Sequence, residues 1–233
     1  KKNEWINKDL ITDVLVLKKP PKRNKAVFSN KEIDKIYDAL SKNESDQKFM
    51  HYTIFSVLYQ FGIRVSSLVR LKVSNIEFDN NRVRYFDCKS KTWAYGYPPD
   101  EGIMVLLKDY IDMQGLSDSD TYLFRDSDAN PISSSNVRDI IYHYYNKAGI
   151  QEKYKHNNQN KNKYNVHTLR FYFITSLCKA GVPETTVQKV IHHKNINNTG
   201  IYNIFQENDI RKGIKDSLYT GISQPYATES EVS

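Results

Sequence analysis

The segment from residue 47 to residue 61 constrains the fold most, because apolar side chains cover nearly every side of the helix that it predicts. A helix of this kind has no face left for solvent, so other elements must pack around it. Gly62 follows and suits the left-handed C-cap that ends many helices. Arg64 then stands just past a buried helix end, which is a rigid position from which to direct a guanidinium group.

Further helices are predicted on both sides of this segment. Ser29 and Glu32 have the spacing of a capping box, and they precede a helix whose apolar residues, among them Ile33 and Ile36, share one face. Later helices are predicted at about 101–114, at about 135–148, at 168–180, from Pro183 toward His192, and, as an amphipathic helix, at 207–219.

Strands are predicted between residues 76 and 98, where the apolar period shifts toward two. Asp79-Asn80-Asn81 marks a turn, and residues 82–88 and 93–97 form two strands of a three-stranded antiparallel sheet. Residues 151–165 contain no aliphatic side chain, so they are predicted to be a surface loop, either disordered or lying along a ligand. The sequence therefore predicts a mainly α protein with a small antiparallel β-sheet.

The organisation of the 233 residues follows from these elements. We expect one folded domain over residues 25–219 and a flexible C-terminal tail over 220–233. Within residues 1–24, positions 18–23 hold four cations and two prolines, a pattern that indicates a basic interdomain linker or a solvated tail. Because the chain begins at Lys1 and not at methionine, we expect an N-terminal part to be missing.

Composition narrows the class of partner. A net charge of +7, with 17 tyrosines among the cations, favours a polyanion, although an A/T-rich genome gives similar usage. Cys88 and Cys178 have no metal-ligand spacing, so we expect reduced thiols and no zinc site. No apolar run reaches about 18 residues and no signal peptide is evident, so we expect a soluble cytoplasmic protein without membrane contact. The absence of a glycine-rich phosphate loop disfavours an ATP- or GTP-driven activity.

The last third of the chain carries an ordered set of polar residues. His167-Thr168-Leu169-Arg170 is followed by His193, 23 positions after Arg170, and then by Tyr202, nine positions further. Upstream lie Arg64 and the hairpin sequence Lys89-Ser90-Lys91-Thr92. Phosphoryl transfer needs fixed cations around the non-bridging oxygens, groups that move protons, and an attacking oxygen in line with the leaving group. These residues would supply all three without a metal or another cofactor.

In order and spacing this set resembles the catalytic signature of the tyrosine recombinase (phage integrase) family, from about residue 25 to about 215. The resemblance implies the catalytic-domain fold of DNA breaking-rejoining enzymes. It also implies site-specific cleavage and rejoining of double-stranded DNA through a 3′-phosphotyrosyl intermediate, with self-association into a tetramer on paired DNA sites.

The resemblance assigns a role to each residue. Tyr202 is the expected nucleophile, and Arg64 and Arg170 are expected to clamp the scissile phosphate. His167, one helical turn before Arg170, is the expected general base or phosphate donor. His193 is the expected second imidazole, with the adjacent His192 as its competitor. Lys91 is the expected general acid for the 5′-oxygen, and Lys89 could take that role in its place.

Three positions depart from the family pattern. The chain has His192 where the family usually has glycine, Ser67 where it often has an acid three places after the first arginine, and Phe171 where it usually has histidine. The departures at Phe171 and His192 favour integration or excision of a mobile element over resolution of chromosome or plasmid dimers. A topoisomerase-like enzyme would use the same residues, and a catalytically inactive DNA-binding accessory protein would share the fold.

Overall fold

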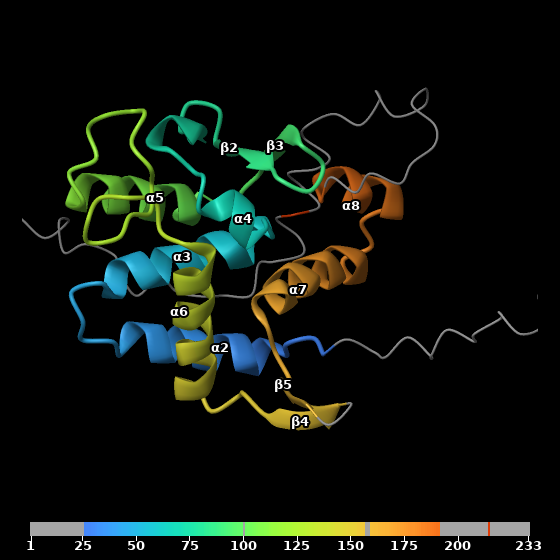
Figure 1. The fold of residues 1–233 in the computed structure, drawn as a ribbon. Coiled ribbons are helices and arrows are strands. Elements are labelled where there is room, and N and C mark those ends of the chain that lie inside the picture. The colour runs from blue at the N-terminus through green and yellow to red at the C-terminus, as the bar shows by residue number, and fades with distance from the viewer. Residues whose placement is uncertain (1–25, 100, 157–158, 192–213, 215–233) are drawn as a thin grey trace, which may run out of the picture.

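The computed structural model describes residues 26–99, 101–156, 159–191 and 214 (Figure 1). Several predictions lie outside these residues: the linker at 1–24, the tail at 220–233, the segment with His193 and Tyr202, and, apart from Ile214, the helix at 207–219. Ile214 is buried and belongs to the hydrophobic core.

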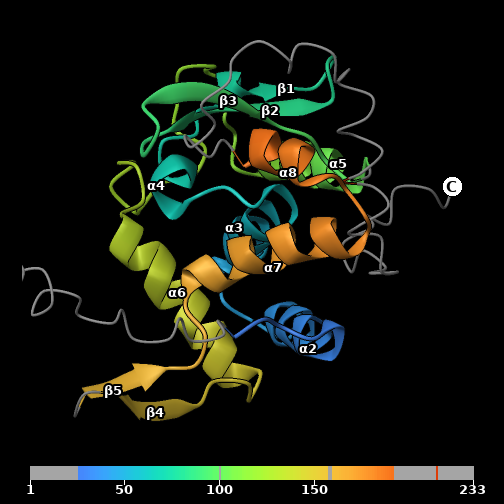
Figure 2. The ribbon, with the colours of Figure 1, turned by 90° about the vertical axis from the view of Figure 1, so that its right-hand side faces the viewer.

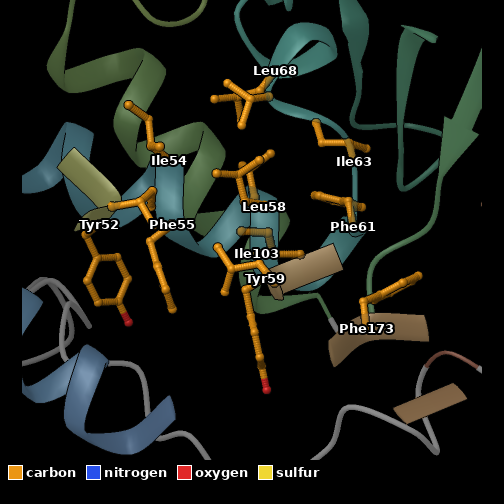
Figure 3. Close-up of a cluster of buried hydrophobic side chains, with 14 of the residues drawn as sticks. Tyr52, Ile54, Phe55, Leu58, Tyr59, Phe61, Ile63, Leu68, Ile103 and Phe173 are labelled. Carbon is orange, nitrogen blue, oxygen red and sulfur yellow. The ribbon is translucent and has the colours of Figure 1, made fainter. Parts of the chain in front are cut away.

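The central element is α3 (Lys48–Phe61), as its apolar sequence predicts. Ten of its 14 residues are buried, and Figure 3 shows Tyr59 and Phe61 among apolar side chains that include Ile103 and Phe173 from other helices. The long helices that contact α3 are α2 (Asn30–Ser41), α5 (Gly102–Met113), α6 (Ser134–Lys147) and α7 (Val166–Lys179). The helices predicted at 29–40, 101–114, 135–148 and 168–180 are thus confirmed to within a few residues.

Two local predictions explain how α2 and α3 are placed. The Ser29 amide donates to the Glu32 carboxylate at 2.8 Å and the Glu32 amide donates to Ser29 Oγ at 3.3 Å, which confirms the capping box. Phe28, just before this cap, packs between Tyr145 and Tyr164 with ring centroids 5.3 and 4.3 Å away. At the end of α3, Gly62 has φ 57°, the left-handed C-cap that the sequence predicts.

The predicted three-stranded sheet is confirmed as β1 (Ile76–Glu77), β2 (Arg82–Asp87) and β3 (Thr92–Gly96), antiparallel in that order. Along β2, Val83, Tyr85 and Asp87 point inward and are buried, whereas Arg84 is exposed and lies over the Trp93 ring at 4.5 Å. The short α4 (Val65–Leu68) contacts β2, and the 3-10 helix η1 (Val73–Asn75) leads from it to the sheet. This contact places Arg64, at the start of α4, beside the sheet.

The prediction of a loop at 151–165 is wrong. The segment forms a second antiparallel pair, β4 (Lys153–His156) and β5 (Gln159–Asn162), which adds a two-stranded sheet to the fold. Polar contacts close its base, because the Gln151 side chain both donates to and accepts from the Tyr164 backbone at 2.9 and 3.0 Å. A two-stranded ribbon with two solvated faces needs no aliphatic residues, so its sequence lacks the alternation that marks a half-buried strand.

The two sheets lie at opposite ends of the molecule, with α7 between them (Figure 2). After α7, Gly181 has φ 77° and α8 (Glu184–Val190) follows. Pro183 is the N-cap of α8, one position before the first turn where the sequence placed it. Within the described residues, every helix is too short or too polar to cross a membrane.

Candidate active site

Arg170 lies on the inward face of α7 and is 8% exposed. Its Nη1 donates to the carbonyl oxygen of Gly62, and its Nη2 donates to the carbonyl oxygen of Ile191 at 2.6 Å. One guanidinium therefore joins the end of α3 to the end of α8. Because Arg64 and His193 each follow one of these carbonyls by two positions, Arg170 fixes the backbone just before both.

Arg64 is the N-cap of α4, with φ −80° and ψ 148°. Its Nη1 donates to the carboxylate of Asp87 at the end of β2, and the two side chains are 14% and 1% exposed. Tyr85, two residues earlier on β2, forms a side-chain hydrogen bond with Arg170. Strand β2 thus brings a carboxylate and a phenol to the two arginines that the sequence predicts as the phosphate clamp. We call Arg64, Asp87 and Arg170 the arginine–aspartate cluster.

The cluster sets the protonation of its members. Burial lowers the pKa of the Arg170 guanidinium and the charge of Arg64 lowers it further, while Tyr85 and Asp87 oppose this shift. Burial raises the pKa of Tyr85 to about 12, so its hydroxyl stays protonated at neutral pH. Burial alone would raise the pKa of Asp87, but amide hydrogen bonds and the two arginines outweigh it and lower that pKa. Asp87 is therefore ionised, and the cluster holds two cations and one anion.

The turn between β2 and β3, residues 88–91, is attached to the same carboxylate. Asp87 Oδ1 accepts hydrogen bonds from the backbone amides of Lys89 and Ser90 at 2.9 and 3.2 Å. The Asp87 carbonyl accepts from the Lys91 amide at 2.7 Å, and Lys91 has φ 57°. Lys89 and Lys91 are both exposed and lie in the turn, between the two strands of the predicted hairpin. We call residues 88–91 the lysine turn.

His167 lies in the first turn of α7, one helical turn before Arg170, as the sequence predicts. The two side chains differ in environment, because His167 is exposed and Arg170 is buried. Asn165 caps this end of the helix through a reciprocal capping box with Thr168. The expectation that His167 and Arg170 point the same way is therefore met in helical position but not in burial.

The structure brings Arg64, Arg170 and the lysine turn together from distant parts of the sequence. His193 and Tyr202, and the competitor His192, lie outside the described residues, so their roles stay predictions. Sequence reasoning missed Asp87, although it left one signal: an acid at an inward position of an alternating strand needs a buried partner. Within the described part of the chain, no group of three His, Cys, Asp or Glu side chains is placed to hold a metal ion.

The chain is similar in sequence to proteins of a known family. The model of the phage integrase family matches residues 26–208. Tyrosine recombinase XerC of Pediococcus pentosaceus is 26% identical over 212 residues, covering 86% of this chain and 64% of that protein. A tyrosine recombinase of Pseudothermotoga lettingae is 32% identical over 171 residues, covering 73% of this chain and 53% of that protein. The chain thus spans between half and two thirds of the length of these relatives.

A solved recombinase structure has a similar fold. The crystal structure of XerA recombinase superimposes with a TM-score of 0.62 and 25% identity, covering 82% of this chain and 65% of that one. The mainly helical architecture with small antiparallel sheets is therefore that of a tyrosine recombinase catalytic domain.

Proposed function

Because the chain belongs to the phage integrase family, we propose that it is a tyrosine site-specific recombinase, which cleaves and rejoins DNA through a 3′-phosphotyrosyl intermediate. One observation supports the proposal beyond the family match: Arg64 pairs with the buried carboxylate of Asp87, the charge of that carboxylate also acts on Arg170, 106 positions after Arg64, and the amides of the lysine turn donate to the same carboxylate. That arrangement suits a single phosphate and a proton donor beside it.

The charge of the cluster supports phosphate as the ligand. Two guanidinium groups and one carboxylate leave one net positive charge, which matches the single negative charge of a phosphodiester. Guanidinium forks fit phosphate oxygens and keep their charge at neutral pH. In the pentacoordinate transition state the non-bridging oxygens gain negative charge, so donors already in place stabilise that state more than the ground state.

The proposed reaction is a transesterification. The Tyr202 oxygen attacks the phosphorus, the bond to the 5′-oxygen breaks, and the DNA becomes linked to the enzyme through its 3′-phosphate. His167 and His193 take up the phenol proton or donate to the phosphate, and Lys91 protonates the departing 5′-oxygen. Attack by a 5′-hydroxyl on the phosphotyrosyl bond reverses the step. The bond energy is conserved, so no nucleotide is hydrolysed.

For the biological role we propose integration or excision of a mobile element by a tetramer on paired DNA sites. The departures at Phe171 and His192 support this role, and a lambda integrase tetramer bound to a Holliday junction is among the structures with a similar fold. Resolution of chromosome or plasmid dimers is the second candidate, which the XerC and XerD names of similar proteins favour.

Suicide DNA substrates test the proposal. A duplex with a nick close to the cleavage position loses its short 5′-hydroxyl fragment, so a covalent protein–DNA adduct accumulates and is visible on a denaturing gel. We expect an adduct that forms equally well in EDTA, because the proposed charges at the phosphate all come from side chains. An adduct that needs magnesium would contradict the mechanism. DNA binding without any adduct would favour the inactive accessory protein.

A further inference from the structure

Asp87 occupies a position that links two parts of the proposed machinery. Its Oδ2 accepts from the Arg64 guanidinium, and its Oδ1 accepts from the Lys89 and Ser90 amides. A carboxylate is planar and rigid, so a shift on one side of it moves the other. The carboxylate is 1% exposed, which means that water cannot replace either set of hydrogen bonds.

We propose that Asp87 is a positioning residue that couples the phosphate clamp, through Arg64, to the lysine turn that carries the general acid. The proposal rests on the proposed function and deepens it. Phosphate stabilisation and leaving-group protonation act on one phosphorus atom, so Arg64 and the lysine must be held in register with each other. A misplacement of about 1 Å can cost on the order of 10² in rate.

Arg64 pairs with the carboxylate of Asp87 in β2 and not with an acid in its own helix. Ser67 stands three places after Arg64, where the family often has an acid, and its side chain is buried. Among the described residues Ser67 Oγ has no hydrogen-bond partner, and a serine carries no charge to balance a guanidinium. The ion pair of Arg64 is made with β2 instead. A carboxylate in β2, unlike one in α4, also accepts hydrogen bonds from the lysine turn.

The anion also allows the two arginines to occupy one buried site. Burial and the charge of Arg64 both disfavour the charged form of Arg170, and Asp87 opposes them. Without Asp87, two guanidiniums would repel each other until DNA arrived. Asp87 therefore holds the clamp assembled in the free enzyme, and the net positive charge that remains attracts the phosphate.

Two substitutions separate the link between Asp87 and Arg64 from the link between Asp87 and the lysine turn. Asp87→Asn removes the charge that holds Arg64 but keeps an oxygen for the amides of Lys89 and Ser90. Asp87→Ala removes both. We expect Asp87→Asn to slow adduct formation by roughly 10- to 100-fold, and Asp87→Ala to slow it further, on the scale found for lost active-site donors.

A substrate with a different leaving group tests the link between Asp87 and the lysine turn. A 5′-bridging phosphorothiolate leaves as a thiolate and needs no proton, so the position of the lysine no longer matters. With this substrate we expect Asp87→Ala and Asp87→Asn to be equally slow, both still below the wild type. A difference that persists would overturn the link to the lysine turn. A rate at wild-type level for Asp87→Asn, with either substrate, would overturn the link to Arg64.

DNA affinity separates positioning from simple loss of structure. Asp87→Asn leaves the cations uncompensated, so its affinity for uncleaved DNA should equal or exceed that of the wild type while its cleavage falls. Weaker binding in proportion to the slower cleavage would overturn the positioning role. Asp79→Asn, an exposed acid in the β1–β2 turn, is the matched control and should change neither quantity.

Amide hydrogen exchange tests the coupling without any reaction. Arg64 donates to one oxygen of the Asp87 carboxylate, and the amides of Lys89 and Ser90 donate to the other oxygen. If the carboxylate couples the two sides, Arg64→Gln should speed hydrogen exchange of these two amides by about tenfold or more. The Asn81 amide, bonded to the Phe78 carbonyl in the other turn of the sheet, should not change. Unchanged exchange at Lys89 and Ser90 would overturn the coupling. If the wild type forms no adduct, the proposed function fails, and this measurement still decides the role of Asp87.

Discussion

The guanidinium of Arg170 donates a hydrogen bond to the carbonyl oxygen of Gly62, 108 positions earlier in the chain. This bond attaches α7 to the C-cap of α3, two residues before Arg64. The clamp is therefore built on the end of α3, the central helix of the fold. The close approach depends on glycine, because Gly62 has φ 57° and an added Cβ would lie 2.5 Å from Phe173 Cδ1.

Gly62→Ala should therefore destabilise the protein and slow cleavage. Backbone strain at a positive φ costs on the order of 1 kcal/mol or more, and the contact with Phe173 adds to it. Gly149→Ala is the matched control, because Gly149 has φ 66° but nothing within 4 Å of an added Cβ. Urea unfolding should show a clearly larger loss for Gly62→Ala. Equal losses would mean that the contact with Phe173 contributes nothing.

Removal of either clamp arginine should impair chemistry more than DNA binding. Arg64→Ala and Arg170→Ala should each slow adduct formation by about 10²- to 10³-fold, because each removes donors that act on the transition state. Arg170→Ala should also lower stability by roughly 1–3 kcal/mol, since the carbonyls of Gly62 and Ile191 lose a buried donor. Single-turnover cleavage and urea unfolding measure the two effects. A parallel fall in affinity and rate would contradict a transition-state role.

The two lysines of the turn are separated by their response to the leaving group. If Lys91 protonates the 5′-oxygen, Lys91→Ala should cleave a normal phosphodiester slowly and a 5′-bridging phosphorothiolate at nearly the wild-type rate. Arg170→Ala should show no such recovery, because its defect lies at the non-bridging oxygens. Recovery of Lys89→Ala instead would assign the general acid to Lys89. Recovery of neither variant would remove the lysine assignment.

The β4–β5 hairpin should contribute phosphate contacts outside the cluster. Lys153, Lys155 and Lys161 are exposed on it, and each lysine that neutralises a phosphate changes the slope of log K against log salt by about 0.9. Replacing the three with glutamine should therefore flatten the slope, as measured by fluorescence anisotropy at several salt concentrations. Lys35→Gln and Lys108→Gln, exposed on α2 and α5, should leave it unchanged. An unchanged slope for the hairpin variant would place the DNA elsewhere.

Sequence reasoning worked where a local pattern determines a local structure. The capping box of Ser29 and Glu32, the buried α3 and the left-handed Gly62 each depend on residues within a few positions of one another. The common site of Arg64, Lys91, His167 and Arg170 is a prediction of another kind, because it comes from their order and spacing along the whole chain.

It failed where hydrogen bonds between distant residues decide the structure. The hairpin at 153–162 is closed by hydrogen bonds between Gln151 and Tyr164. Its strands bury no face, so the sequence lacks the apolar alternation that predicts a strand. Asp87 reads as an ordinary strand-end acid until Arg64, 23 positions earlier, is seen to meet its carboxylate. His167 is exposed and Arg170 is buried, a difference that their spacing along the helix does not predict.

The central claim is tested most directly by determining which tyrosine becomes joined to the DNA and which end of the broken strand it holds. The adduct formed on a suicide substrate is digested, and mass spectrometry locates the modified tyrosine, while DNA labelled on either side of the break shows which end is attached. The account predicts attachment of the 3′-phosphate side to Tyr202, and a Tyr202→Phe variant that binds DNA normally but forms no adduct. Attachment at another tyrosine, attachment of the 5′-phosphate side, or an undiminished adduct in Tyr202→Phe would contradict it.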